Sequence, residues 1–197
     1  HVFYADEGAQ TIRVAYSEEL FELGSVPQVL SAVAGNILSM KIVDNVRLQD
    51  IAFPKSMINE FKGPNFGLPG IRKLVGVQDR PLIGTIVKPK VGLNSEKHAE
   101  VAYNSFVGGC DLVKDDENLS DQKFNSFEKR AELTLKLAEK AESETGEKKM
   151  YLCTVTAPTC REMIRRMNFL KDLGASYVMV DIVPAGWTAI QTLREEA

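Results

Sequence analysis

Residues 177–182 form a short, mostly apolar run, Tyr177-Val178-Met179-Val180-Asp181-Ile182. Its apolar residues are consecutive and do not alternate with polar ones, which is typical of a strand covered by helices on both faces. Similar runs occur earlier, at 81–87, 110–113 and 151–156. We therefore predict four strands that belong to one parallel sheet.

Helical patterns alternate with these strands, at 95–106, 125–143 and 160–173, and resume near Ala189. Strands that alternate with helices of this length are typical of right-handed βαβ units, so the fold class is α/β. A closed (β/α)8 TIM barrel needs eight such units. The sequence predicts either about the first four βα units of a barrel or a small open sheet.

The chain divides into two unlike parts. We expect residues 1–75 to form part of an α+β amino-terminal domain, and residues 76–197 to form the amino-terminal half of the barrel. The stretch 63–70 is dense in Gly and Pro and is the best candidate for the region where the two parts meet.

Short elements are expected in the first part. Residues 11–16 and 42–51 have the composition of strands. Ser25, with Pro27 two residues later, predicts the start of a helix. The pair Gly35-Asn36 then interrupts the apolar pattern.

The composition excludes several classes of protein. Apolar residues make up 44% and charged residues 26%, and the net charge of −3 gives no reason to expect nucleic acid or an anionic membrane as partner. No stretch approaches the roughly 20 apolar residues that a membrane span needs. Cys110, Cys153 and Cys160 are an odd number without a C-x-x-C pair, which argues against a disulfide framework and a zinc site. We expect buried, unreactive thiols and a cytoplasmic protein.

Charged residues concentrate after the second predicted strand, in Lys114-Asp115-Asp116-Glu117-Asn118. Reactive groups of parallel α/β folds gather at the carboxyl ends of strands. Asp116 and Glu117 supply the hard oxygen ligands that Mg²⁺ prefers. The alternative is a solvated acidic loop in which Lys114 forms a salt bridge.

Two further lysines follow the first predicted strand. Pro89 favours an extended backbone at Lys88, and in an extended chain Lys88 and Lys90 project to the same side. Two cations at one mouth could bind a bisphosphate, and crowding by a neighbouring cation would lower the pKa of a lysine that acts as a general base. The alternative is ordinary surface charge.

Other catalytic motifs are absent. His98 lies in the run Glu96-Lys97-His98, which we expect to be an exposed helix face without a catalytic role. The sequence contains no G-x-S-x-G elbow, no Walker-type loop and no complete G-x-G-x-x-G fingerprint. The sequence therefore gives little support for a serine hydrolase or a nucleotide-binding protein.

Residues 84–93 and 108–118 together closely resemble the large subunit of ribulose-1,5-bisphosphate carboxylase/oxygenase (RuBisCO), and the resemblance covers nearly the whole chain. Its character is archaeal, of form III, and not plant-like. Ile86, Thr154 and Lys123 depart from the more usual pattern. Because the family's chain is roughly twice as long and closes a barrel, we expect this sequence to be a fragment that is inactive alone.

The resemblance implies a Mg²⁺ site. Lys114 looks like the lysine that CO₂ carbamylates, and its carbamate would bind Mg²⁺ together with Asp116 and Glu117. An ammonium is a poor ligand whereas a carbamate is an oxygen anion, which explains a lysine among these carboxylates.

The resemblance also implies a substrate and an assembly. Lys88 looks like the base that enolises ribulose 1,5-bisphosphate, and Lys90 looks like the group that orients the reacting oxygen. Asn36 resembles the asparagine that reaches into the active site of a neighbouring subunit, so a homodimer or a larger assembly of dimers is implied. The expected reactions are carboxylation to 3-phosphoglycerate and oxygenation with O₂, in nucleotide (AMP) salvage.

Three other interpretations remain open. A RuBisCO-like enolase or isomerase of sulfur salvage would share the fold, the Mg²⁺ site and the lysine base. A half-barrel could be a non-catalytic piece with exposed strand edges. An unrelated Mg²⁺ aldolase or epimerase could use the same barrel, because fold does not fix chemistry.

Overall fold

The computed structural model describes all residues from 1 to 197 and divides them into two compact units, His1–Gly63 and Pro64–Ala197. The division falls in the Gly- and Pro-rich stretch at 63–70. Helix α4 (Gly67–Val75), which our expected division at residue 75 places in the first part, belongs to the second unit.

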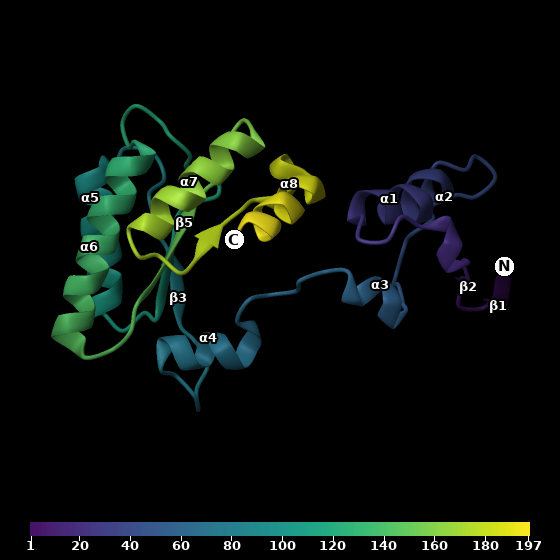
Figure 1. Ribbon diagram of the computed structural model, residues 1–197, viewed down its shortest axis with the longest axis horizontal. Coiled ribbons are helices and arrows are strands. Elements are labelled where there is room, and N and C mark those ends of the chain that lie inside the picture. Colours follow the sequence, from purple (N-terminus) through teal and green to yellow (C-terminus); the bar gives the residue numbers. More distant parts are fainter. The chain divides into compact units, whose positions relative to one another are not determined.

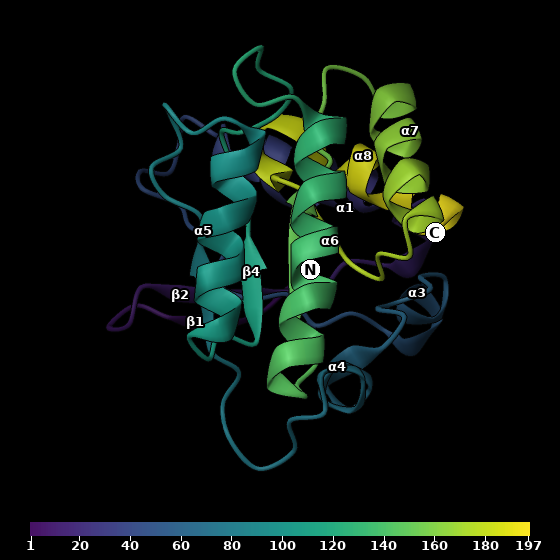
Figure 2. The ribbon, with the colours of Figure 1, turned by 90° about the vertical axis from the view of Figure 1, so that its left-hand side faces the viewer.

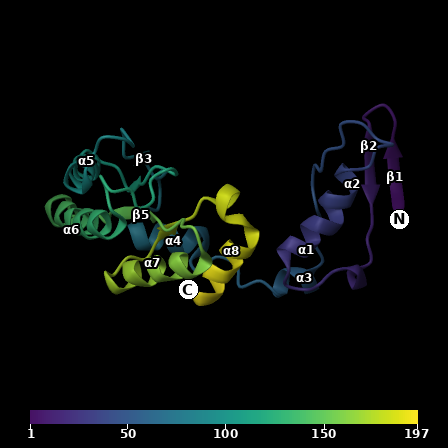
Figure 3. The ribbon, with the colours of Figure 1, turned by 90° about the horizontal axis from the view of Figure 1, so that it is seen from above.

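The first unit begins with an antiparallel hairpin of β1 (Val2–Asp6) and β2 (Thr11–Val14), whose strands lie side by side in Figure 3. The short 3₁₀ helix η1 (Glu18–Leu20) and then α1 (Val26–Leu30) follow. The Ser25 hydroxyl accepts a hydrogen bond from the Gln28 amide at 3.4 Å, and Pro27 lies in the first turn. The predicted helix start at Ser25 is confirmed.

One expectation about the first unit is wrong, namely that residues 42–51 form a strand. The chain stays helical through Gly35 and Asn36, in the π-helical turn η2 (Ser31–Gly35) and then α2 (Asn36–Leu38). Residues 42–51 form no strand, and α3 (Lys55–Asn59) is the next element. Ile42 is 87% exposed and Asn45 adopts a left-handed φ of 56°, so the run is neither buried nor extended.

The second unit contains the predicted parallel sheet. Its strands lie in chain order and each neighbouring pair is parallel: β3 (Gly84–Ile86), β4 (Leu112–Lys114), β5 (Met150–Thr154) and β6 (Val178–Met179). A helix follows each strand: α5 (Ser95–Val107), α6 (Phe127–Thr145), α7 (Cys160–Asp172) and α8 (Ile182–Glu196). Four successive βα units of a TIM barrel, preceded by part of an amino-terminal domain, are therefore present.

Helices α5 and α6 lie side by side against the sheet (Figures 1 and 2). Fully buried side chains fill the space between these layers, among them Phe106, Val113, Phe127 and Cys153. Helix α8 is kinked at Gly186, whose φ of 78° and ψ of 163° are not helical. The short segment before the kink is capped by the Asp181 side chain, which accepts from the Val183 amide at 3.1 Å, and the segment after the kink agrees with the helix expected near Ala189. None of the helices combines the length and apolar character that a bilayer crossing requires.

The cysteines differ in their surroundings. Cys153 is buried, and its burial raises the pKa of the thiol well above the ordinary value. Cys110 is half-buried, whereas Cys160 is exposed at the first position of α7. The expectation of buried thiols is therefore wrong for Cys160.

Candidate active site

The register of β3 and β4 brings the two predicted lysine sites together. Ile86 pairs with Lys114, and the Val87 amide donates to the Lys114 carbonyl at 3.0 Å. Lys88, one residue after Val87, and Asp116, two residues after Lys114, follow the strands at the same edge of the sheet, and the Lys88 ammonium forms an ion pair with the Asp116 carboxylate. A cation after one strand thus meets an anion after the next.

Lys114 lies at the centre of this edge. Its ammonium forms an ion pair with Glu117, donates to the Asp115 carbonyl at 3.2 Å and lies 3.5 Å from the sulfur of Met179. The Lys114 side chain is only 20% exposed. Its ammonium is therefore partly shielded from water and contacts two oxygen atoms and one sulfur atom.

The two expected metal-ligand carboxylates are held in the ionised form. Burial raises the pKa of Asp116, but hydrogen bonds from Lys88 and from the Asn118 backbone and side chain outweigh it and hold that pKa well below the ordinary value. The hydrogen bond from Lys114 lowers the pKa of Glu117. Both side chains are thus available at neutral pH as anionic oxygen donors.

Not every predicted site residue belongs to this cluster. Lys90 is exposed, two residues after Lys88, and makes none of the cluster's ion pairs. That Lys88 and Lys90 face one mouth stays a prediction. Asn36 is exposed at the start of α2 and belongs to the first unit.

Asp115 lies between these residues in sequence but is itself completely buried. Its carboxylate accepts from the Tyr151 hydroxyl at 2.5 Å, from the Thr154 amide at 3.1 Å and from Arg130 Nε at 3.1 Å. Burial raises the pKa of Asp115, but His98, Arg130 and Tyr151 together lower it below the ordinary value. The sequence therefore places one fully buried anion directly beside the candidate ligands.

His98 contributes to the same buried cluster, and the expectation that it is exposed is wrong. Its side chain is 2% exposed, and its Nε2 lies 3.1 Å from Asp115 Oδ1, off the ideal hydrogen-bonding direction. The signal was present in the helical period: Ser95, Ala99, Ala102 and Phe106 are buried on the same side of α5. The charged neighbours Glu96 and Lys97 hide this pattern.

Two buried arginines anchor the loop that follows β4. Arg130 donates to the carbonyls of Ser120 at 2.8 Å and Asn125 at 2.9 Å. Arg166 donates to the Ser120 hydroxyl and the Thr156 carbonyl, each at 2.9 Å. Neither arginine could be predicted from the sequence, because a single charge in a helix does not reveal its burial.

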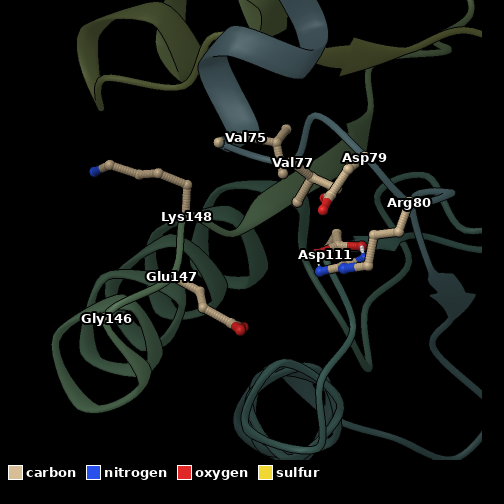
Figure 4. Close-up of a pocket in the computed structure, with 9 residues that line it drawn as sticks. Val75, Val77, Asp79, Arg80, Asp111, Gly146, Glu147 and Lys148 are labelled. Atoms are coloured by element: carbon tan, nitrogen blue, oxygen red, sulfur yellow. Dashed lines mark hydrogen bonds and ion pairs between the residues drawn. The ribbon is translucent and has the colours of Figure 1, made fainter.

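A pocket lies at the opposite end of β4 (Figure 4). It is lined by Arg80, Asp111, Glu147 and Lys148, among others, and Arg80 holds Asp111 through two hydrogen bonds of 2.6 and 2.7 Å. Catalytic groups of parallel β/α folds gather at the carboxyl ends of strands, not at this amino end. The candidate active site is therefore the lysine–carboxylate cluster.

No group of three His, Cys, Asp or Glu side chains lies close enough to hold a metal ion. In the cluster, Asp116 and Glu117 are the carboxylates and Lys114 is the third candidate ligand. A metal ion there would therefore need an oxygen donor on Lys114, which its ammonium does not supply.

The fold and this site define a β/α-barrel protein whose lysines and carboxylates meet where the strands end. Family models described as ribulose bisphosphate carboxylase large chain match the sequence twice: the catalytic domain at residues 67–197 and the N-terminal domain at residues 1–57. The chain belongs to the ribulose bisphosphate carboxylase large-chain family.

Archaeal relatives support this assignment. The ribulose bisphosphate carboxylase of Methanosarcina mazei is 99% identical over the whole chain, and that of Methanocaldococcus jannaschii is 52% identical over 94% of it. The chain spans 46% and 43% of the lengths of these two relatives.

Solved structures agree. A dimeric archaeal Rubisco from Hyperthermus butylicus matches 96% of this chain, and 45% of its own length, with a TM-score of 0.91 and 45% identity. An octameric Rubisco from Pyrococcus horikoshii matches 99% of this chain, and 46% of its own length, with a TM-score of 0.94 and 45% identity. The sequence-based assignment to an archaeal RuBisCO is confirmed.

Proposed function

We propose that the full-length protein carrying this chain catalyses the Mg²⁺-dependent carboxylation of ribulose 1,5-bisphosphate to 3-phosphoglycerate, with oxygenation as a competing reaction. The observation that carries the proposal is the contact of Lys114 with Glu117 beside the Lys88–Asp116 ion pair. The relatives of the same family, named as ribulose bisphosphate carboxylases, support it.

The cluster has the chemistry to hold Mg²⁺ once Lys114 is carbamylated. Asp116 and Glu117 are ionised oxygen donors, which suit this hard cation. A carbamate would replace the positive end of Lys114 by a third anionic donor next to Glu117. When bound, Mg²⁺ acts as a Lewis acid that polarises oxygens of the substrate.

Carbamylation needs the neutral Lys114 amine. Its nitrogen attacks the carbon of CO₂, a new N–C bond forms, and one C–O π pair moves onto oxygen. The nitrogen then releases a proton to solvent, which leaves a carbamate anion. Lys114 is only 20% exposed, and its amine lies 3.5 Å from the Met179 sulfur.

Lys88 and Lys90 are proposed to act on the substrate. After the Lys88 ammonium has released a proton to solvent, its neutral amine accepts the proton from the carbon next to the carbonyl. The C–H electron pair forms the C=C bond, and the carbonyl π pair moves onto oxygen to give the enediolate. Lys90 orients the reacting oxygen, and Asn36 completes the site of a neighbouring subunit. A homodimer-based assembly follows, which the dimeric and octameric solved relatives support.

The test supplies the full-length protein with ribulose 1,5-bisphosphate, ¹⁴C-labelled bicarbonate and Mg²⁺ in deuterated water. Labelled 3-phosphoglycerate is the expected product. Exchange of substrate hydrogen for deuterium without incorporation of label would overturn the proposal in favour of a RuBisCO-like enolase or isomerase. If neither deuterium exchange nor incorporation of label is observed, the proposal is overturned in favour of a non-catalytic protein.

A further inference from the structure

We infer that buried Asp115 is a positioning residue that sets Lys114 and Asp116 on the active-site side of β4, through its contacts with His98, Arg130 and Tyr151. The inference deepens the proposed function, because it rests on a carbamate at Lys114. Asp115 touches no substrate and acts through its two neighbours.

The alternation of side chains along the extended strand places Asp115 and its two neighbours on opposite faces. Successive side chains of a strand point to opposite faces. Val113 and Asp115 are both completely buried, and Asp115 packs against residues of α5, α6 and β5. The Asp115 amide donates to the Leu152 carbonyl at 3.1 Å, so the strand ladder continues past Lys114. Lys114 and Asp116 are thereby directed to the other face, where Asp116, itself only 2% exposed, pairs with Lys88.

Both oxygens of the Asp115 carboxylate have partners that hold it in place. Oδ1 receives the Tyr151 hydroxyl and faces His98, while Oδ2 receives Arg130 and the Thr154 amide. A fully buried carboxylate held by groups from three elements has little freedom to rotate. The backbone on either side of it is therefore held in one conformation.

The orientation of the His98 ring is itself supported. The Ser95 hydroxyl donates to Asn125 Oδ1 at 3.0 Å, which leaves the Asn125 amide nitrogen 3.4 Å from His98 Nδ1. An Nδ1 that accepts from Asn125 places the ring proton on Nε2, the atom that faces Asp115. Helix α5 and the loop before α6 thus both help to fix the position of the Asp115 carboxylate.

The chain supplies a matched control at the other end of the same strand. Asp111 is also buried, at 1% exposed, and is also paired with an arginine, Arg80. Asp111→Asn and Asp115→Asn therefore make the same chemical change in a buried aspartate that pairs with an arginine, although Arg80 is 41% exposed and Arg130 is completely buried. Only Asp115 lies beside the candidate ligands.

The experiment measures ¹³C NMR of the carbamate in the full-length protein with ¹³CO₂, as a function of Mg²⁺ concentration, together with thermal unfolding. We expect Asp115→Asn to raise the Mg²⁺ concentration for half-maximal carbamate by about 10- to 100-fold, the usual effect of losing a group that orients a ligand. Asp111→Asn is expected to lower the unfolding temperature without this change in Mg²⁺ dependence.

Tyr151→Phe keeps the inference testable if Asp115→Asn does not fold, because it removes one hydroxyl and preserves the ring. It is expected to shift the Mg²⁺ dependence in the same direction. An unchanged Mg²⁺ dependence in Tyr151→Phe, with a normal carbamate in the unmodified protein, overturns the inference alone. Absence of any carbamate in the unmodified protein overturns the proposed function as well.

Discussion

The Lys88 ammonium and the Asp116 carboxylate meet across two neighbouring strands, although 28 residues separate them in sequence. Their meeting depends on the parallel pairing of Ile86 with Lys114, one step inside the sheet. The candidate site is therefore a product of strand register as much as of residue identity. Substitutions that disturb the pairing of β3 with β4 should therefore change the geometry of the site without replacing any of its side chains.

Gly84 provides a direct way to disturb that pairing. A Cβ atom at this position would lie 2.4 Å from the Leu112 side chain on the neighbouring strand. We expect Gly84→Ala to lower the free energy of unfolding by about 1–3 kcal/mol through overpacking, measured by urea denaturation. In a Leu112→Ala background the cost of Gly84→Ala should largely disappear; an equal cost in both backgrounds would contradict this account.

Lys114 is expected to be the residue that takes up CO₂. Lys114→Gln should abolish the ¹³C carbamate signal, because an amide nitrogen does not attack CO₂. Lys149→Gln is the matched control, since the Lys149 side chain is buried and paired with Glu147 but lies at the amino end of β5. A carbamate that survives Lys114→Gln would move the modification to another lysine.

Lys88 is expected to act after the carbamate has formed. Lys88→Gln should reduce carboxylation by about 10²- to 10⁴-fold, the usual contribution of a general base, while the carbamate at Lys114 persists. Steady-state assays with labelled bicarbonate measure the first quantity and ¹³C NMR the second. If the carbamate is lost together with the activity, Lys88 supports Asp116 and is not the base.

The ion pairs of Glu162 predict a dependence of stability on pH. Hydrogen bonds from Arg165 and Arg166 lower the pKa of Glu162 to about 2. A depressed carboxyl pKa stabilises the folded chain above the ordinary pKa of the group, and this stability is lost as the pH falls toward 2.

The measurement compares the urea midpoint of Glu162→Gln with that of the unmodified chain at several pH values. The variant should be less stable at pH 7, and the difference should shrink steadily below about pH 4.5. Glu132→Gln, at an exposed position of α6, is the control and should show no such trend. A difference that stays constant down to pH 2 would contradict the assignment.

The helices α5, α6 and α7 of the second unit could be predicted because each is long enough to show its period, and the strands because each lies in a continuous apolar run between two helices. The first unit could be predicted less well. Residues 42–51 have the composition of a strand, but a strand also needs a neighbour and an extended backbone, and Asn45 is left-handed. The composition of the run reveals neither whether a neighbouring strand is present nor whether the backbone is extended.

The same difference applies to the site. The lysines and carboxylates stand at strand ends, so their meeting could be expected from the parallel order alone. The buried side of the site could not. Arg130 and His98 are ordinary helix residues until their partner, Asp115, is known, and that partner is distant in sequence from His98. Strand alternation was the available signal: it separates Asp115 from Lys114 and Asp116 within one acidic run.

The alternation along β4 also bears on how this family can diversify. Under the proposed function, Lys114 and Asp116 on one face of the strand end act on the reacting molecule, whereas Asp115 on the helix side fixes the position of these two groups. Relatives could therefore replace the residues that contact the reacting molecule, and so acquire a new reaction, while they keep the residues on the helix side unchanged. Asp115 and Arg130 would then record common descent across relatives whose chemistry has diverged.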